Sequence, residues 1–180
     1  MKTNGPFVIN ESNVKYKNNW IEVVEDKVTR PNGQPGLFGI VNYISGVAVL
    51  PLDEEGFVYL TEEFHYALEA ADIEAVSGGI DPGEEPSAAA KRELKEELGI
   101  EATEWIDLGT VNPFTTVIKS PQRMYLAKQL TFGESHQEET EDIKLVKIKF
   151  EEAVKMAMDS KITHGPSALL ILKAKNYLGV

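Results

Sequence analysis

The stretch GGIDPGEEPSAAAKRELKEELGI, residues 78–100, places a glycine-rich loop directly before a short acidic segment. Pro86 suits the first turn of a helix, because its missing N–H would have no partner there. Gly99 is a natural left-handed stop, and the residues between these two positions are good helix formers. The sequence therefore predicts a helix from about Pro86 to Leu98.

Three glutamates share one face of this predicted helix. Glu93, Glu96 and Glu97 stand at positions i, i+3 and i+4, so their side chains lie within one turn of each other. Like charges at these spacings repel each other unless a cation lies among them. Carboxylate oxygens favour Mg²⁺ or Mn²⁺, and the chain has no Cys with which to build a zinc site.

The alternative interpretation is an ordinary solvated acidic face, which is the usual role of acidic residues on a helix. Such a face does not require Gly78, Glu84 and Arg92 at fixed positions upstream and within it. Seven fixed identities at these spacings are expected by chance in about one chain in 10⁵ or fewer. We therefore favour a metal-binding catalytic helix.

This stretch resembles the signature of the Nudix hydrolase family. Every fixed position of that signature is matched, by Gly78, Glu84, Arg92, Glu93, Glu96, Glu97 and Gly99. The resemblance implies an α/β fold, the Nudix α/β/α sandwich with a mixed β-sheet. It also implies hydrolysis of a nucleoside diphosphate linked to another moiety, by attack of water on phosphorus, with Mg²⁺ or Mn²⁺ bound to the motif.

The resemblance implies roles for single residues as well. The implied metal ligands are Glu93, Glu96, Glu97 and the backbone carbonyl of Ser77. Glu93 and Glu97 are the most secure of these and count as catalytic residues. Arg92 and Glu84 match a pair that holds the loop against the helix, and Gly78 and Gly99 are structural positions of the motif.

Composition limits the classes of protein to which the chain can belong. Its 180 residues, 42% of them hydrophobic, suit one domain with a small extension. The absence of Cys is compatible with a reducing cytoplasm, where we expect the protein. A net charge of -11 argues against nucleic-acid or anionic-membrane partners, and no apolar run approaches the ~18–20 residues that cross a bilayer.

Short apolar and β-branched runs predict strands on both sides of the motif. These strands are expected at residues 20–28, 38–43, 46–52, 57–61, 104–110, 123–130 and 143–150. Two amphipathic helices are expected at residues 151–159 and 167–177. Strands flanked by helices in this order indicate an α/β or α+β domain.

The first 45 residues separate the subclasses of the family. A hairpin around Trp20 predicts an N-terminal β extension at residues 1–45, ahead of a Nudix hydrolase domain at residues 46–180. This extension resembles that of the ADP-ribose pyrophosphatase and nucleoside diphosphate sugar hydrolase branch, where it helps to form a homodimer and to bind substrate. The resemblance implies a small-molecule sugar nucleotide as substrate. His65 stands where that branch commonly has Arg, and Ser77 where it usually has Ala.

A general base is also required, and branch members often carry it as a Glu in the loop after a downstream proline. Residues 111–120 contain no acidic residue, whereas residues 133–142 contain several. Glu138 or Glu139 is therefore the expected base, with Glu139 favoured. The alternative is a solvated acidic turn.

Four residues are candidates for binding substrate. Trp20 and Phe64 could stack on a base, although an aromatic residue in a strand is more often part of the core. Arg123 could clamp a phosphate, and the alternative is a surface partner of a nearby carboxylate. His65 is the fourth candidate, because of its place in the branch.

Three functions remain open from the sequence. The favoured one is metal-dependent hydrolysis of a sugar nucleotide such as ADP-ribose to a nucleoside monophosphate and a sugar phosphate. A second is a Nudix pyrophosphatase acting on dinucleotide polyphosphates, coenzyme A or NADH. A third is a non-catalytic Nudix-like module that binds a ligand.

Overall fold

The computed structural model describes residues 2–135 and 143–180, and these form two compact units. The first unit holds the chain up to Ser45 together with Asn112–Pro121. The second unit holds Gly46–Val111 and Gln122–Val180. Residues 112–121 therefore belong with the N-terminal unit, although they follow the motif in the sequence.

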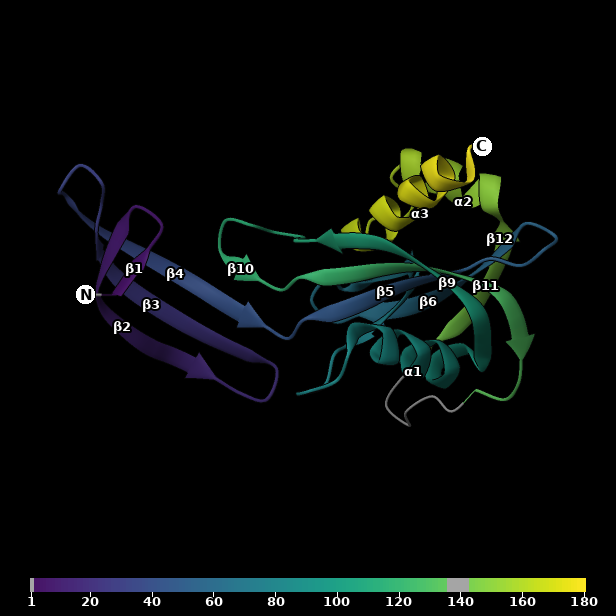
Figure 1. The fold of residues 1–180 in the computed structure, drawn as a ribbon, viewed down its shortest axis with the longest axis horizontal. Coiled ribbons are helices and arrows are strands. Elements are labelled where there is room, and N and C mark those ends of the chain that lie inside the picture. Colours follow the sequence, from purple (N-terminus) through teal and green to yellow (C-terminus); the bar gives the residue numbers. More distant parts are fainter. Residues whose placement is uncertain (1, 136–142) are drawn as a thin grey trace. The chain divides into compact units, whose positions relative to one another are not determined.

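The first unit is a five-stranded sheet in the order β1-β2-β3-β4-β10 (Figure 1). Its strands are β1 (Lys2–Asn4), β2 (Phe7–Lys17), β3 (Ile21–Thr29), β4 (Pro35–Tyr43) and β10 (Ile118–Lys119). The turn between β3 and β4 is closed by the N–H of Gly33, which donates to the carbonyl of Arg30 at 2.9 Å. Gly33 has a φ of 77°, the left-handed region in which glycine is favoured. Strand β10 joins the edge of the sheet parallel to β4.

The second unit contains two sheets, in the orders β8-β5-β11-β9 and β12-β6-β7. Their strands are β5 (Gly46–Pro51), β6 (Phe57–His65), β7 (Ala70–Glu74), β8 (Val76–Gly79), β9 (Ile100–Val111), β11 (Gln122–Phe132) and β12 (Lys144–Lys149). Strands β5 and β11 are parallel, whereas β8 and β9 pair antiparallel to them. The predicted mixed sheet is therefore confirmed.

Three helices cover the two faces of the central sheet. They are α1 (Pro86–Leu98), α2 (Phe150–Met158) and α3 (Gly165–Leu178). Figure 1 shows α1 on one side of β5 and β11, and α2 and α3 on the other. None of the helices in the described part of the chain is long and apolar enough to cross a membrane.

The core consists of two layers, one on each face of the sheet. Successive residues of a strand point to opposite faces, so Val47 and Val49 pack with α1 while Ala48 and Leu50 pack with α2 and α3. Strand β5 is buried along its whole length, as expected for a strand covered on both faces. This arrangement is the α/β/α sandwich that the sequence predicts.

The helix from Pro86 to Leu98 was predicted with its correct ends, and the other predicted elements are present with ends shifted by a few residues. Strands β1, β2, β7, β8 and β10 were not predicted. Phe150 was placed at the end of a strand but begins α2, where its ring is buried and its N–H donates to the carbonyl of Gly56 at 2.9 Å. The role of residues 1–45 in dimerisation stays a prediction.

Candidate active site

Helix α1 carries the motif and is fixed at both ends by local chemistry. Pro86 occupies the first turn, and Gly99 ends the helix at φ 64° with its N–H donating to the carbonyl of Lys95 at 2.9 Å. A Cβ on Gly99 would lie 2.6 Å from the carbonyl oxygen of Gly133. The last turn of α1 therefore lies directly against residues 133–135, and only glycine combines this backbone angle with this close approach.

Strand β8 lies directly beside the carboxylate of Glu93. A Cβ on Gly78 would lie 2.0 Å from Cδ of Glu93, far inside van der Waals contact. Ser77 precedes this glycine, and its hydroxyl donates to the carbonyl of Ala75 at 2.8 Å. The strand backbone at Ser77 and Gly78 and the Glu93 side chain are thus brought together, 15 residues apart in the sequence.

Arg92 fixes the loop that joins β8 to α1. Its Nε and Nη2 donate to the two carboxylate oxygens of Glu84 at 3.1 and 3.0 Å, a bidentate pair. Nη2 also donates to the carbonyl of Gly79 at 2.8 Å, and the backbone N–H of Asp81 donates to Glu84 at 3.0 Å. The guanidinium therefore holds both ends of this loop to the first half of α1.

The remaining nitrogen of Arg92 points toward the other motif carboxylates. Its Nη1 lies 2.7 Å from Oε1 of Glu93 and 3.1 Å from Oε2 of Glu96. The side chain of Glu93 is 13% exposed and that of Glu96 is 48% exposed, while Glu97 as a residue is 7% exposed. One guanidinium thus pairs with Glu84, Glu93 and Glu96, and of these Glu84 and Glu93 are well shielded from water.

This donor set fits a divalent cation. With Glu84 counted, four motif carboxylates carry four formal negative charges against the one positive charge of Arg92, and all of their donor atoms are hard oxygens. The close approach of β8 brings the backbone of Gly78 to Glu93 without an intervening side chain. The residues present therefore suit Mg²⁺ or Mn²⁺, in agreement with the sequence-based expectation.

A second cluster of polar side chains lies where β6, β7 and the start of α3 meet. His65 Nε2 lies 3.1 Å from one oxygen of Glu74, and His164 Nδ1 lies 2.7 Å from the other. Ser167 Oγ is 2.7 Å from the same nitrogen of His164 and accepts a hydrogen bond from the N–H of Ala75 at 2.9 Å. The buried Glu74 therefore links the end of β7 to α3, just ahead of the residues that approach Glu93.

A family model described as the NUDIX domain matches residues 42–164, more than half of the chain. The chain belongs to the NUDIX domain family. A second model, described as the nucleoside diphosphate sugar hydrolase N-terminal domain, matches residues 9–41. The two matches together span residues 9–164, so each unit of the structure is matched over part of its length.

Similar proteins include curated relatives of comparable length. An ADP-ribose pyrophosphatase of Bacillus subtilis is 28% identical over 153 residues, which are 84% of this chain and 83% of the relative. A methanol dehydrogenase activator of Bacillus methanolicus is 29% identical over 156 residues, with the same two shares of length. An ADP-ribose pyrophosphatase of Mycobacterium tuberculosis is 29% identical over 123 residues, 64% of this chain and 58% of the relative.

A solved structure described as an ADP compounds hydrolase superposes on this chain with a TM-score of 0.85. The match covers 99% of this chain and 97% of that protein, at 19% sequence identity. At this identity the likeness shows the fold alone. It agrees with the Nudix sandwich described above.

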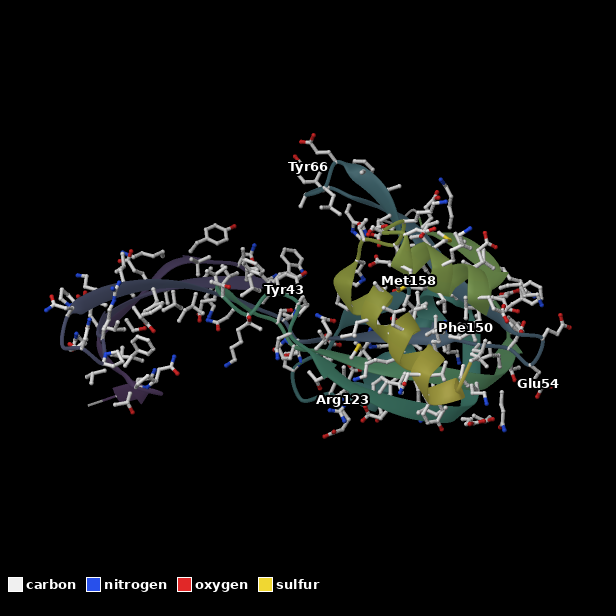
Figure 2. All side chains as sticks on the ribbon, turned by 90° about the horizontal axis from the view of Figure 1, so that it is seen from above. Tyr43, Glu54, Tyr66, Arg123, Phe150 and Met158 are labelled. Carbon is white, nitrogen blue, oxygen red and sulfur yellow. The ribbon has the colours of Figure 1, made fainter. Side chains whose placement is uncertain are left out.

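The structure places the four residues that were predicted to bind substrate in different surroundings. Arg123 lies on β11 at the surface of the second unit (Figure 2), where it forms a salt bridge with Asp107 and its Nη1 donates to Thr110 at 3.0 Å. The alternative of a surface ion pair thus describes Arg123 in this structure. Trp20 and Phe64 are both exposed rather than part of the core. His65 is paired with Glu74, as described above.

Some candidate residues lie outside the part of the chain that the structure describes, and another was not predicted from the sequence. Glu138 and Glu139 lie outside the described residues, so their role as the base of this Nudix chain stays a prediction. Glu74 was missed because its contacts depend on how β6 and β7 pair and on where α3 begins. In the sequence, the signal for Glu74 was its position between a strand-like run of residues and Gly78, the first glycine of the motif.

Low pH should weaken the ion pair between Arg92 and Glu84, which holds the loop of this Nudix motif against α1. The hydrogen bond from Arg92 holds the pKa of Glu84 below its ordinary value, and the same pair raises the pKa of Arg92. A carboxylate with a depressed folded-state pKa stabilises the protein above its unfolded pKa of about 4.3 and loses this effect as pH falls through the folded-state pKa. Urea unfolding at pH 7 and across pH 5 to 3 should therefore show Glu84→Gln less stable at pH 7 and with a shallower loss in acid.

The matched control for this prediction is Glu85→Gln, which removes the charge of the adjacent, exposed carboxylate at the start of α1. Its stability at pH 7 should stay within about 0.5 kcal/mol of the original protein. Equal stability of Glu84→Gln and Glu85→Gln at every pH would show that the Arg92 pair contributes nothing to folding.

Proposed function

We propose that this protein is a divalent-metal-dependent Nudix hydrolase that cleaves the pyrophosphate bond of a nucleoside diphosphate sugar, ADP-ribose or a related compound. The products are a nucleoside monophosphate and a sugar phosphate. The observation that carries the proposal is the contact of Gly78 with Glu93 beside the Arg92–Glu84 clamp, which gathers the motif at one place. The named activity of the relatives from B. subtilis and M. tuberculosis, and the match of residues 9–41, support the substrate class.

The proposed ligands of the cation are Glu93, Glu96, Glu97 and the carbonyl of Ser77. A bound Mg²⁺ or Mn²⁺ would neutralise charge on the pyrophosphate and lower the pKa of an attacking water. Arg92 positions Glu93 from one side, and the Gly78 backbone limits its movement on the other. Because α1 packs against the sheet through Ala89, Ala90 and Leu94, these carboxylates are carried by a rigid element.

The proton of the attacking water requires an acceptor, which we assign to Glu139 or, failing that, Glu138. Positioned proton transfer contributes roughly 10²–10⁴-fold to a rate. Glu139→Gln or Glu138→Gln should therefore lower kcat about 100-fold at saturating substrate, without loss of the metal requirement. If neither variant lowers kcat by about 100-fold, the base lies elsewhere in the chain.

The function is tested by phosphate release, coupled to a phosphatase, from a panel of substrates. The panel holds ADP-ribose, GDP-mannose, UDP-glucose, diadenosine polyphosphates, NADH, coenzyme A and nucleoside triphosphates, each with Mg²⁺, Mn²⁺ or a chelator. Turnover that is led by a sugar nucleotide and abolished by the chelator supports the proposal. If the folded protein releases phosphate from none of these compounds, the proposal is contradicted. That result would favour a module that binds its ligand without turnover.

A second candidate is hydrolysis of a dinucleotide polyphosphate, NADH or coenzyme A at the same site. The observation that favours this second candidate is His65, which stands where the sugar-nucleotide branch commonly has Arg. The His65 side chain is paired with Glu74. The same panel separates the two candidates by which compound has the highest kcat/KM. A homodimer and a cytoplasmic location stay predictions from the sequence, and a monomeric mass in light scattering at micromolar concentration would contradict the first.

A further inference from the structure

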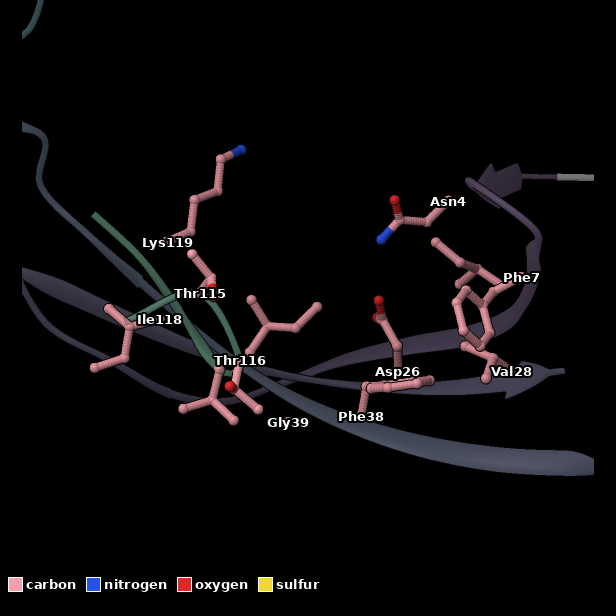
Figure 3. Close-up of a pocket in the computed structure, with 13 residues that line it drawn as sticks. Asn4, Phe7, Asp26, Val28, Phe38, Gly39, Thr115, Thr116, Ile118 and Lys119 are labelled. Carbon is pink, nitrogen blue, oxygen red and sulfur yellow. The ribbon is translucent and has the colours of Figure 1, made fainter. Parts of the chain in front are cut away.

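The first unit has a partly open cavity of about 250 Å³ that contains none of the motif residues. Most of its wall is apolar, from Phe7, Ile9, Val28, Phe38, Ile40 and Val117. The rings of Phe7 and Phe38 meet edge to face, with their centroids 5.2 Å apart. Figure 3 shows Phe7 and Val28 on one side of the cavity and the segment from Thr115 to Lys119 on the other.

A carboxylate stands in this apolar wall. Asp26 is only 7% exposed, and its Oδ1 has no hydrogen-bond partner among the described residues. Figure 3 shows the Asp26 carboxylate rising from β3 toward the side chain of Asn4, between the two sides of the cavity. A buried charge without a hydrogen-bond partner is strongly unfavourable. Oδ1 of Asp26 therefore requires a hydrogen-bond donor from outside the first unit.

We propose that this cavity binds a small organic cation, a protonated amine or amidine on an aromatic body. The cationic group would donate to Oδ1 of Asp26, and the body would pack against Phe7 and Phe38. A cation beside a carboxylate and an aromatic ring gains from both the ion pair and the ring quadrupole. The volume is slightly below that of sites for drug-sized ligands, which limits the ligand to about one or two rings.

An anionic ligand is disfavoured at the same place. Asp26 would repel a phosphate or carboxylate beside it, and Figure 3 shows Lys119 on the side of Thr115 and Thr116, apart from Asp26. The threonines at positions 115 and 116 and the amide of Asn4 supply neutral polar groups at the rim. The carboxylate of Asp26 therefore favours a cation in its own part of the cavity.

The test uses benzamidine as the cationic probe and benzamide as its neutral counterpart, on the full chain, by saturation-transfer NMR and thermal melting. Because hydrogen bonds to a buried charge are among the stronger ones, benzamidine should bind at least about 10-fold tighter than benzamide. Asp26→Asn should abolish that difference. It should also raise the melting temperature of the protein alone, since it removes the charge from a buried side chain whose Oδ1 has no hydrogen-bond partner among the described residues.

The matched control is Glu25→Gln, the neighbouring residue of β3, whose side chain points to the opposite face and pairs with Lys15 at 2.9 Å. It should keep benzamidine affinity within about twofold. Thr116→Phe, at an exposed position of the rim, fills the cavity and should abolish binding even if Asp26→Asn fails to fold. Equal binding of benzamidine and benzamide, or unchanged affinity in Thr116→Phe, would overturn the proposal. The proposal would also be overturned if benzamidine did not bind the original protein and Asp26→Asn changed the protein from a dimer to a monomer. That result would assign Asp26 to a contact with a second copy of the chain.

Discussion

Glu97→Gln is expected to lower the rate of ADP-ribose hydrolysis by about a thousandfold while leaving the protein folded. Glu97 is the most buried of the motif carboxylates at 7% exposure, and it shares its face of α1 with Glu93. A metal contributes several kcal/mol to charge stabilisation in the transition state, and each 1.36 kcal/mol is about a factor of ten in rate. The measurement is kcat in Mg²⁺ and in Mn²⁺, with circular dichroism to show that the variant folds.

The control for this prediction is Glu101→Gln, which makes the same change of charge on the exposed strand that follows α1. Glu101 pairs with the exposed Lys95, and exposed ion pairs contribute at most about 1 kcal/mol. Its hydrolysis rate should therefore stay within about twofold. A Glu97→Gln variant that kept its rate within tenfold, at an unchanged metal requirement, would remove Glu97 from the metal site.

The motif helix could be predicted because its signals are local. Pro86 and Gly99 fix its two ends through backbone geometry alone, and the i, i+3 and i+4 spacing decides which glutamates share a face. The alternation of strands and helices around it indicated an α/β or α+β domain, and the resemblance to the Nudix family implied the sandwich. These features depend on residues close together in the chain, so they need no knowledge of how distant segments pair.

The parts that were missed depend on distant pairing. Glu74 lies opposite Thr61 in the register of β6 and β7, and only this register lets its side chain reach His65. It meets His164 only because α3 begins beside β7, 90 residues later. A shift of one residue would turn each side chain to the other face. In the same way, Asp26 looks like one more polar strand residue until β10 returns to β4 and a cavity forms around it.

The charges of the motif explain how α1 is kept in place. Three glutamates within one turn of α1 repel each other. The helix is nevertheless held against the sheet, where its residues Ala89 and Leu94 are buried. Arg92 contacts Glu84, Glu93 and Glu96 at once, so its single cation offsets this repulsion and closes the loop. Arg92 therefore joins the loop to the helix, and the assignment of Glu93 and Glu97 as metal ligands stays a proposal.

Gly78→Ala is expected to lower the hydrolysis rate by well over about 100-fold with little loss of stability. The new Cβ would lie 2.0 Å from Cδ of Glu93, whereas ordinary contact is 3.4–4 Å, so the carboxylate has to move by more than 1 Å. A misplacement of about 1 Å in a reacting site can cost 10²-fold. Because the obstructing atoms are the end of a flexible side chain, the fold itself can accommodate the methyl group. Rates in Mg²⁺ and the melting temperature of the same preparation measure both effects.

Gly165→Ala is the matched control, since a Cβ there meets nothing within 4 Å and its φ is not in the left-handed region. It should leave the rate unchanged and the stability within about 0.5 kcal/mol. If Gly78→Ala melts far below Gly165→Ala, the methyl group displaces the β8 backbone rather than Glu93, and the loss of rate says nothing about the ligand. If Gly78→Ala folds normally and keeps full activity, Glu93 does not need the position it has beside β8, and the assignment of this carboxylate as a metal ligand fails.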